Sequence, residues 1–278
     1  MKYISNHLER DNKLSLIRAE LLDSILVSLK KKPGIVGVFL GGSLAKDNHD
    51  LYSDIDLRIV VTEERYAEYV HAKQELPKQW GNILFYEDLY PTAPYTIVHY
   101  DSFIKVDIFY YNVDKLQPSI WLKEIKVLLD TDGIINDVRN KSNEFIYNVS
   151  QADVIRWNGK VFSYIHEVYR RVQREEYYYA LTMMNNLRSF IVQGWDMNSN
   201  RQPNDGWDWS KIEGSRTHLE AWQLSLLEGW MCERDQLQIM KTLQSMIPEI
   251  RKLYMSLCDK TDLEREPEKF DTIINLVL

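Results

Sequence analysis

The sequence has few of the residues that mark disulfide scaffolds, zinc sites or disordered chains. It contains only two cysteines, Cys232 and Cys258. Neither belongs to a C-x-x-C or His-rich spacing, which argues against a structural zinc site and a disulfide framework. Its 278 residues include only 11 glycines and 8 prolines, while 45% are hydrophobic, so we expect a chain that buries a real core.

Long hydrophobic runs are also missing. No stretch approaches the ~20 consecutive apolar residues that a membrane span requires. The N-terminus is charged from its first residues, unlike a secretory signal. We therefore expect a soluble protein of the reducing cytoplasm, without a membrane partner.

An excess of basic residues is absent as well. The formal net charge is −7, and the basic runs are short: Lys30 to Lys32, and Arg170, Arg171 and Arg174. A surface that follows nucleic-acid phosphates needs clustered Lys and Arg. The charge balance therefore disfavours a nucleic-acid partner and suits a small cationic one.

The first part of the chain, residues 1–145, predicts a mixed α+β domain. A helix marked by Leu14, Ile17, Leu21 and Ile25 is expected to end at Lys32-Pro33-Gly34. A second helix is predicted over 63–74, and the close spacing of the runs around Tyr100-Asp101-Ser102 favours an antiparallel hairpin. The predicted strands, rich in β-branched and aromatic residues, are 34–40, 54–61, 82–86, 95–100, 103–111 and 126–130.

The second part, residues 146–278, changes to a period of 3.6 residues. Apolar positions from Val154 to Val172, and from Ala180 to Phe190, step by three and four and predict two amphipathic helices. Two more are expected around 219–230 and 240–250, with Pro248 kinking or splitting the last. This predicts a C-terminal α-helical bundle, joined to the first domain through the polar stretch 140–143.

A glycine turn follows the first predicted strand. Gly41-Gly42-Ser43 comes just before a helical turn, and Lys46 follows it. Such a turn presents backbone N–H groups and a hydroxyl, and glycine permits a phosphate to approach closely. Alone this signal is weak, because Gly-Gly-Ser occurs in many ordinary turns.

Three carboxylates strengthen the interpretation of this turn as a phosphate-binding site. Asp54 and Asp56 are two apart on a strand, so their side chains point to the same face. Asp107 interrupts an otherwise apolar strand, where a lone Asp is rare without a partner. Singly, Asp54 is also typical of a capping residue and Asp56 of a solvent-facing one. Together they predict a site in which hard oxygen ligands bind Mg²⁺ or Mn²⁺ with nucleoside triphosphate phosphates.

These motifs resemble those of the DNA polymerase β-like nucleotidyltransferase superfamily: a hydrophobic residue, Gly, Gly or Ser, Ser, a spacer of about ten residues, then Asp, hydrophobic, Asp. Within it the chain resembles the aminoglycoside (streptomycin) 6-adenylyltransferases. Two further segments are similar to theirs, Leu128 to Gly133 and, more loosely, Trp157 to Arg188. The resemblance implies a catalytic domain over 1–145 and an acceptor-binding helical domain over 146–278.

The resemblance also implies residue roles. Gly42 and Ser43 would hold the triphosphate of ATP, Asp54 and Asp56 would bind the metal, and Asp107 would be a third metal ligand or the general base. Lys46 is expected to contact phosphate, although Leu44 replaces the Arg that is usual in this turn. The implied reaction moves AMP from ATP to a hydroxyl of a small cationic acceptor such as an aminoglycoside, releasing pyrophosphate. The enzyme would act as a monomer or homodimer.

The segment 204–240 is the predicted contact for that acceptor. It contains seven acidic residues against three basic ones, with four tryptophans interleaved. Acids with aromatic rings favour a polyhydroxylated cation. Ordinary exposed helix faces and a core stripe containing Trp222 and Trp230 also explain the composition. Trp207-Asp208-Trp209, in a loop, is least easily explained by packing.

Other interpretations stay open. The acceptor could be another small molecule of lincosamide type, a protein or a tRNA, and a non-catalytic nucleotide-binding relative would be expected to lack one of the three aspartates. Glu87, at the end of the third strand, is a weaker candidate for the base than Asp107. His99 and His166 are expected to be packing or surface residues, because neither has a second metal ligand near it in the sequence.

Overall fold

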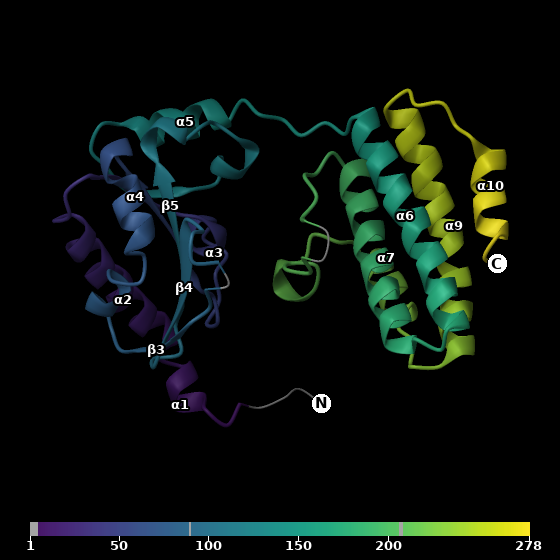
Figure 1. The fold of residues 1–278 in the computed structure, drawn as a ribbon, viewed down its shortest axis with the longest axis horizontal. Helices are drawn as coiled ribbons and strands as arrows, with labels where there is room; N and C mark the ends of the chain where they lie inside the picture. Colours follow the sequence, from purple (N-terminus) through teal and green to yellow (C-terminus); the bar gives the residue numbers. More distant parts are fainter. Residues whose placement is uncertain (1–4, 89, 206–207) are drawn as a thin grey trace. The chain divides into compact units, whose positions relative to one another are not determined.

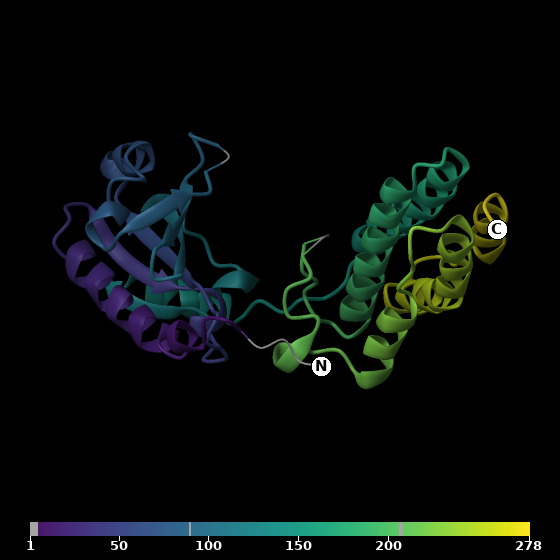
Figure 2. The same cartoon turned by 90° about the horizontal axis from the view of Figure 1, so that it is seen from below.

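The computed structural model describes residues 5–88, 90–205 and 208–278. The chain divides into two compact units, Met1–Ile146 and Tyr147–Leu278. Figures 1 and 2 show both units from two directions.

The first unit is built on a six-stranded mixed sheet with the order β3-β4-β5-β2-β1-β6. β2 and β5 are parallel, and the other neighbouring pairs are antiparallel. The strands are β1 (Ile35–Leu40), β2 (Ile55–Val61), β3 (Ile83–Tyr86), β4 (Tyr95–Tyr100), β5 (Lys105–Asn112) and β6 (Lys126–Asp130). The helices are α1 (Leu8–Asp11), α2 (Leu14–Leu29), α3 (Gly42–Ala45), α4 (Glu63–His71) and α5 (Ile134–Ser142), with 3₁₀ turns η1 (Pro77–Gln79), η2 (Val113–Lys115) and η3 (Ile120–Leu122).

One face of this sheet packs against helices. β5 alternates between half-buried and buried residues, as expected for a strand with one face on a core. Its buried residues Val106 and Ile108 belong to the same core as Ile25 of α2 and Tyr69 of α4. Figure 1 shows α2 and α4 together on that side of the strands.

The opposite face is covered over only part of its area. Phe39, Val60, Ile135 and Val138 form a separate small core under α5, with Tyr111 packed against it. Val60 and Tyr111 lie toward the ends of β2 and β5, and the starts of the same two strands carry no residue of this core. We call the uncovered part the open half-face. It consists of the half-buried or exposed residues Asp54, Asp56, Phe85, Glu87, Ile97, His99, Lys105 and Asp107.

The predicted α+β class, with a mixed sheet before a helical bundle, is confirmed. The predicted hairpin is present, with β4 antiparallel to β5. Four expected strands begin one or two residues before the observed ones, and two of these differences concern the site or the hairpin. Asp54 lies just before β2, and Phe103 stands in the hairpin turn with φ of +68° instead of starting β5.

The second unit is helical, with α6 (Gln151–Gln173), α7 (Tyr177–Asn198), α8 (Ala221–Gly229), α9 (Gln236–Lys260), α10 (Pro267–Asn275) and the 3₁₀ turn η4 (Gly214–Arg216). α6, α7 and α9 run side by side in both views (Figures 1 and 2). Their shared core includes Val161, Leu187 and Ile250, each fully buried. Trp157 adds a polar tie, donating from Nε1 to the carbonyl of Phe190 at 2.6 Å.

One prediction about the helices is wrong, one alternative is excluded, and α1, α5 and α10 were not predicted. The polar stretch 140–143 is no linker, because 140–142 are the last turn of α5, where the Ser142 hydroxyl donates to the Val138 carbonyl. α9 is not split, since it continues through Pro248 with buried residues on both sides of it. α10 begins at Pro267, and proline at a first helical position was a signal that the sequence offered.

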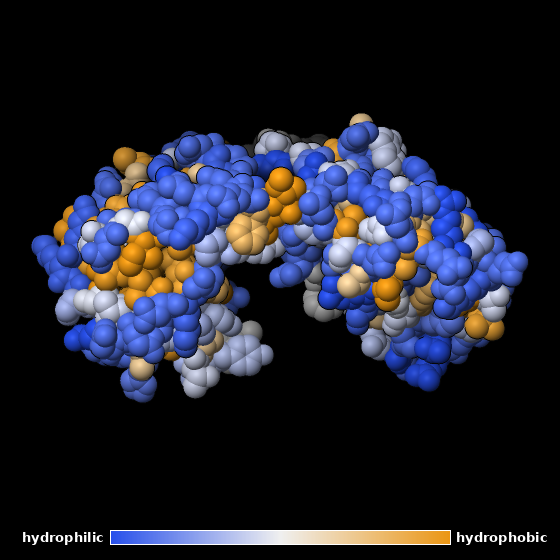
Figure 3. Space-filling model, turned by 90° about the horizontal axis from the view of Figure 1, so that it is seen from above, coloured by the Kyte–Doolittle hydropathy of each residue, from blue (hydrophilic) through white to orange (hydrophobic). Residues whose placement is uncertain are grey.

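Apolar side chains are largely withdrawn from the surface. Figure 3 shows hydrophilic residues over most of both units, with apolar patches between them. None of the described helices combines the length and apolar character that crossing a bilayer demands.

Candidate active site

The glycine turn between β1 and α3 is shaped by its contact with Asp56. Gly42 adopts φ of +59°, which disfavours residues with a side chain. A Cβ at Gly42 would lie 1.8 Å from Oδ2 of Asp56, so only glycine fits there. The Gly41 N–H donates to the Asp56 carbonyl at 2.9 Å. The turn is therefore fixed against the start of β2, with its backbone beside a carboxylate.

The three predicted aspartates lie on one face of the sheet. In the parallel pairing of β2 with β5, Asp56 stands opposite Asp107. Asp54 precedes Asp56 by two residues, and the ammonium of Lys105 reaches both Asp54 Oδ2 at 2.8 Å and Asp107 Oδ2 at 3.1 Å. The structure thus brings Asp54, Asp56 and Asp107 together on the open half-face.

Two cations are interleaved with these carboxylates, and the sequence reasoning missed both. Lys105 bridges Asp54 and Asp107, and Arg58 lies with Nη2 3.4 Å from Asp56 Oδ1. The Arg58 guanidinium also donates to the Asp107 carbonyl at 3.2 Å and lies over the Phe109 ring. The signal was available, because Arg58 is two residues after Asp56 and Lys105 two before Asp107. On a strand that spacing places each cation on the face of its aspartate.

The carboxyl group of Asp107 has a raised pKa. Burial raises the pKa of its carboxyl above the ordinary value, Lys105 opposes that rise, and the charges of Asp54 and Asp56 add to it. Burial would lower the pKa of the Lys105 ammonium, but its hydrogen bond to Asp54 and the charges of both aspartates raise it. The other oxygen of Asp107, Oδ1, is buried without a hydrogen-bond partner among the described residues. A buried carboxylate oxygen without a hydrogen bond destabilises the fold, so a ligand such as a cation is expected at this atom.

The loop before Asp54 is anchored by a buried arginine. Arg18 of α2 is 3% exposed, and its Nη1 donates to the carbonyls of Leu51 and Ser53 at 3.2 and 2.9 Å. The Ser53 hydroxyl accepts from the Asp50 N–H at 2.9 Å. The helix and the turn thus fix the backbone immediately before Asp54. An arginine amid the apolar stripe of the first predicted helix was the signal for this role.

The remaining predicted residues lie around the turn. Ser43 is buried at 4% exposure. Lys46 follows α3 and forms an ion pair with Glu124, so its ammonium is not directed to the aspartates. The structure therefore places Lys46 at the rim of the turn.

The donor set fits a divalent cation. Carboxylate oxygens are hard ligands suited to Mg²⁺ or Mn²⁺, and Asp107 Oδ1 lacks a partner. As they stand, no three His, Cys, Asp or Glu side chains in the described part of the chain are grouped tightly enough to hold a metal ion. A cation is nevertheless present at this point, because the Lys105 ammonium lies between two of the carboxylates.

Replacing Lys105 with methionine should change stability and metal binding in opposite directions. Without metal, the unfolding free energy should fall by about 1–2 kcal/mol, because the carboxylates lose their counter-charge. The affinity for Mn²⁺ should rise at least about threefold, since a competing positive charge is gone. Urea denaturation in chelator and an EPR titration with Mn²⁺ measure the two effects.

The matched control is Lys141→Met, which removes an exposed ion pair with Asp137 on α5. It should leave Mn²⁺ affinity unchanged. Equal Mn²⁺ affinity for Lys105→Met and the wild type would show that the ammonium does not compete with the metal.

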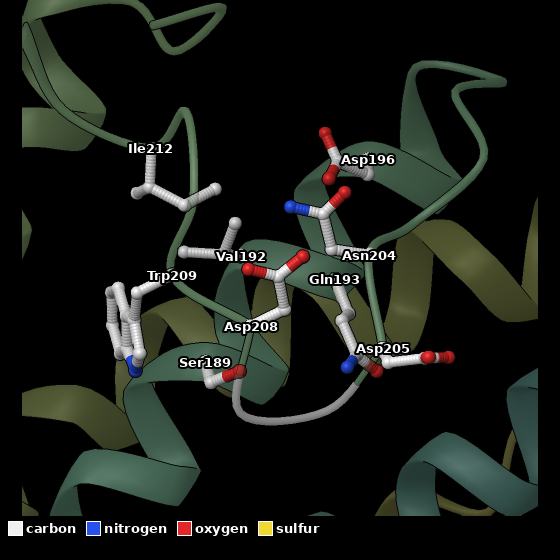
Figure 4. Close-up of a pocket in the computed structure, with 9 residues that line it drawn as sticks. All are labelled: Ser189, Val192, Gln193, Asp196, Asn204, Asp205, Asp208, Trp209 and Ile212. Carbon is white, nitrogen blue, oxygen red and sulfur yellow. The ribbon is translucent and has the colours of Figure 1, made fainter. Parts of the chain in front are cut away.

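The helical unit carries a separate pocket between α7 and the segment that follows it (Figure 4). Asp196, at its edge, is buried and held by Arg201 at 3.1 Å and His218 at 2.8 Å. The Asp208 carboxylate points into the space between Val192 and Asn204. The lining residues are Ser189, Val192, Gln193, Asp196, Asn204, Asp205, Asp208, Trp209 and Ile212.

The tryptophans predicted to contact the acceptor differ in their surroundings. Trp209 lines the pocket, and its Nε1 is buried without a partner among the described residues. Trp230 is buried in the bundle core, as a core stripe predicts, whereas Trp222 is 42% exposed. Trp207 lies outside the described residues.

Comparison with known proteins assigns the chain. An aminoglycoside 6-adenyltransferase from Bacillus subtilis is similar over 94% of this chain and 97% of its own, with 14% identity and a TM-score of 0.44. A nucleotidyltransferase-like protein from Exiguobacterium sibiricum 255-15 is similar over 96% and 88%, with 12% identity and a TM-score of 0.35. No curated protein matches. The family model of streptomycin adenylyltransferase matches residues 17–200, more than half of the sequence and the whole of the carboxylate site. The chain is therefore an adenylyltransferase, and it belongs to the streptomycin adenylyltransferase family.

Proposed function

We propose that this enzyme transfers AMP from ATP to a hydroxyl of an aminoglycoside, with Mg²⁺ or Mn²⁺ at Asp54, Asp56 and Asp107 and with release of pyrophosphate. The observation that carries the proposal is the convergence of these three carboxylates beside a turn whose Gly42 has no room for a side chain. A carboxylate cluster next to a glycine turn suits a triphosphate that arrives with divalent cations.

The chain's own residues have separate parts in the reaction. Gly42 and Ser43 receive the β- and γ-phosphates at the turn. The acceptor oxygen forms a bond to the α-phosphorus while the bond from that phosphorus to the β-phosphate bridging oxygen breaks, and pyrophosphate leaves. The proton of the acceptor hydroxyl goes to Asp107. A raised pKa of the Asp107 carboxyl favours this role, since a base works best with a pKa nearer the working pH.

The bound divalent cations supply charge neutralisation and alignment of the attacking and leaving oxygens. Asp54 and Asp56 would hold them, with Asp107 as base or third ligand. Lys105, which bridges Asp54 and Asp107 by ion pairs, would then be free to face the phosphates. Arg58 fixes the Asp107 backbone through its 3.2 Å hydrogen bond and keeps the two strands in register at the site.

The helical unit is proposed to bind the acceptor. Its pocket is lined by the exposed acidic residues Asp205 and Asp208 and by Trp209. Carboxylates next to an aromatic ring suit a polyhydroxylated cation. The family match ends at residue 200, before this segment, so the preference for an aminoglycoside rests here on chemistry.

Labelled ATP distinguishes the possible acceptors. The protein should be incubated with α-³²P-ATP, Mg²⁺ and, separately, aminoglycosides, lincosamides and total tRNA. We expect label on an aminoglycoside, with pyrophosphate formed in equal amount and no transfer in chelator. Label that appears only on tRNA or on protein contradicts the proposal.

Asp56→Asn should abolish transfer without destabilising the fold. We expect activity to fall by two orders of magnitude or more, about the effect of losing a group that stabilises transition-state charge. The melting temperature in chelator should be equal or higher, because one of three repelling charges is removed and Arg58 retains an oxygen partner. A large drop in melting temperature would instead assign Asp56 a structural role.

A further inference from the structure

The open half-face continues beyond the carboxylates across β4 and β3. In the antiparallel pairing of β4 with β5, Ile97 stands opposite Asp107 and His99 opposite Lys105. On the next strand Phe85 stands opposite His99, and the Glu87 N–H donates to the Ile97 carbonyl at 2.9 Å. Directly opposed residues share a face. Phe85, Glu87, Ile97 and His99 therefore form a strip in line with the catalytic aspartates, which we call the β3–β4 strip.

The side chains of the strip contact one another although they are open to solvent. The Phe85 and His99 rings stack with centroids 4.2 Å apart and an interplanar angle of 16°. Nε2 of His99 lies 3.3 Å from Oε2 of Glu87. Even so, Phe85 is 54% exposed and the Glu87 side chain 57%. A large aromatic ring held flat and left half exposed, with a carboxylate beside it, is not accounted for by core packing.

The line through the attacking and leaving oxygens determines which substrate lies over the β3–β4 strip. In phosphoryl transfer the attacking and leaving oxygens are roughly in line through the phosphorus. The order across the sheet is the Gly42 turn beside β2, then Asp56, Asp107, Ile97 and the end of β3. If pyrophosphate leaves over the glycine turn, the attacking oxygen approaches from the other end of that row, which is the β3–β4 strip.

We infer that the β3–β4 strip is the subsite for the part of the acceptor that carries the reacting hydroxyl. This inference rests on the proposed function and names Phe85 and Glu87 as binding residues in the first unit. The exposed face of Phe85 stacks on a sugar or guanidinium group, and Glu87 pairs with its positive charge. Glu87 thus binds the acceptor and Asp107 takes the proton. The acceptor class that fits best is a cationic polyol, because a neutral one would offer Glu87 hydrogen bonds without an opposite charge and an anionic one would be repelled.

Direct binding measurements separate this subsite from the nucleotide site. Streptomycin and a non-hydrolysable ATP analogue should be titrated separately, with Mg²⁺, by calorimetry into the wild type, Phe85→Ala and Glu87→Gln. We expect the streptomycin Kd to rise about threefold to thirtyfold for Phe85→Ala and at least about threefold for Glu87→Gln. The Kd of the ATP analogue should stay within about twofold of the wild type.

The controls remove similar groups outside the strip. Leu16→Ala deletes a side chain of α2 that is 63% exposed, and Glu75→Gln removes an exposed carboxylate that pairs with Lys78. Neither should alter streptomycin binding, and Phe85→Tyr, which keeps the ring, should retain it. In turnover assays Glu87→Gln should raise the KM for streptomycin and leave kcat within about threefold.

Two outcomes overturn the inference. Weaker binding of the ATP analogue by Phe85→Ala would assign the strip to the nucleotide. Wild-type streptomycin affinity in both variants would show that the strip does not bind this acceptor. Failure of the proposed function has a different signature, since it appears as absence of AMP transfer from labelled ATP by the wild-type enzyme.

Discussion

Repulsion among three carboxylates is the constraint around which the first unit is organised. Asp54, Asp56 and Asp107 lie on one face of a sheet, close enough for Asp54 and Asp56 to raise the pKa of the Asp107 carboxyl. Like charges at such a distance are costly without a cation between them. Lys105 and Arg58 supply that charge from the same strands, and the protein folds with its acids already together. Neither Lys105 nor Arg58 gives a hydrogen bond to Oδ1 of Asp107, which stays without a partner among the described residues.

The fold keeps this cluster accessible by covering the sheet unevenly. Helices α2 and α4 pack on one face, whereas the small core under α5 covers only the part of the other face around Phe39 and Val60. The carboxylates lie in the remaining area, and the Gly42 turn closes against one of them. Because the same uncovered area continues over β4 and β3, one surface offers places for phosphate, metal and acceptor in sequence across the strands.

Much of this arrangement was predictable from the sequence, for identifiable reasons. Strand residues two apart share a face, so Asp54 and Asp56 had to point the same way, and an Asp in the apolar run around Asp107 needed a partner. The mixed sheet and helical bundle followed from hydrophobic period. The parallel pairing that sets Asp56 opposite Asp107 could not be predicted from the sequence, because strand order depends on long-range packing that no local pattern specifies.

The misses have physical causes as well. Lys105 and Arg58 were not predicted, because charged residues at alternate strand positions are also typical of a solvated sheet face. The stretch 140–143 was predicted to be a linker because it is polar, although the Asp137–Lys141 pair at helical spacing indicated the turn of helix that is present. Pro248 does not divide α9, because Met246 and Ile250 on either side of it are fully buried in the bundle core.

The proposed chemistry requires that Asp54 and Asp56 hold divalent cations together with a nucleotide, whether Asp107 is a third ligand or the base. An EPR titration with Mn²⁺, in the presence of a non-hydrolysable ATP analogue, checks this by counting the ions bound to the wild type and to Asp56→Asn. We expect about two Mn²⁺ per chain in the wild type and fewer or more weakly bound ions in the variant. Equal Mn²⁺ binding by the two proteins, or binding by neither, would show that these carboxylates do not hold the metal.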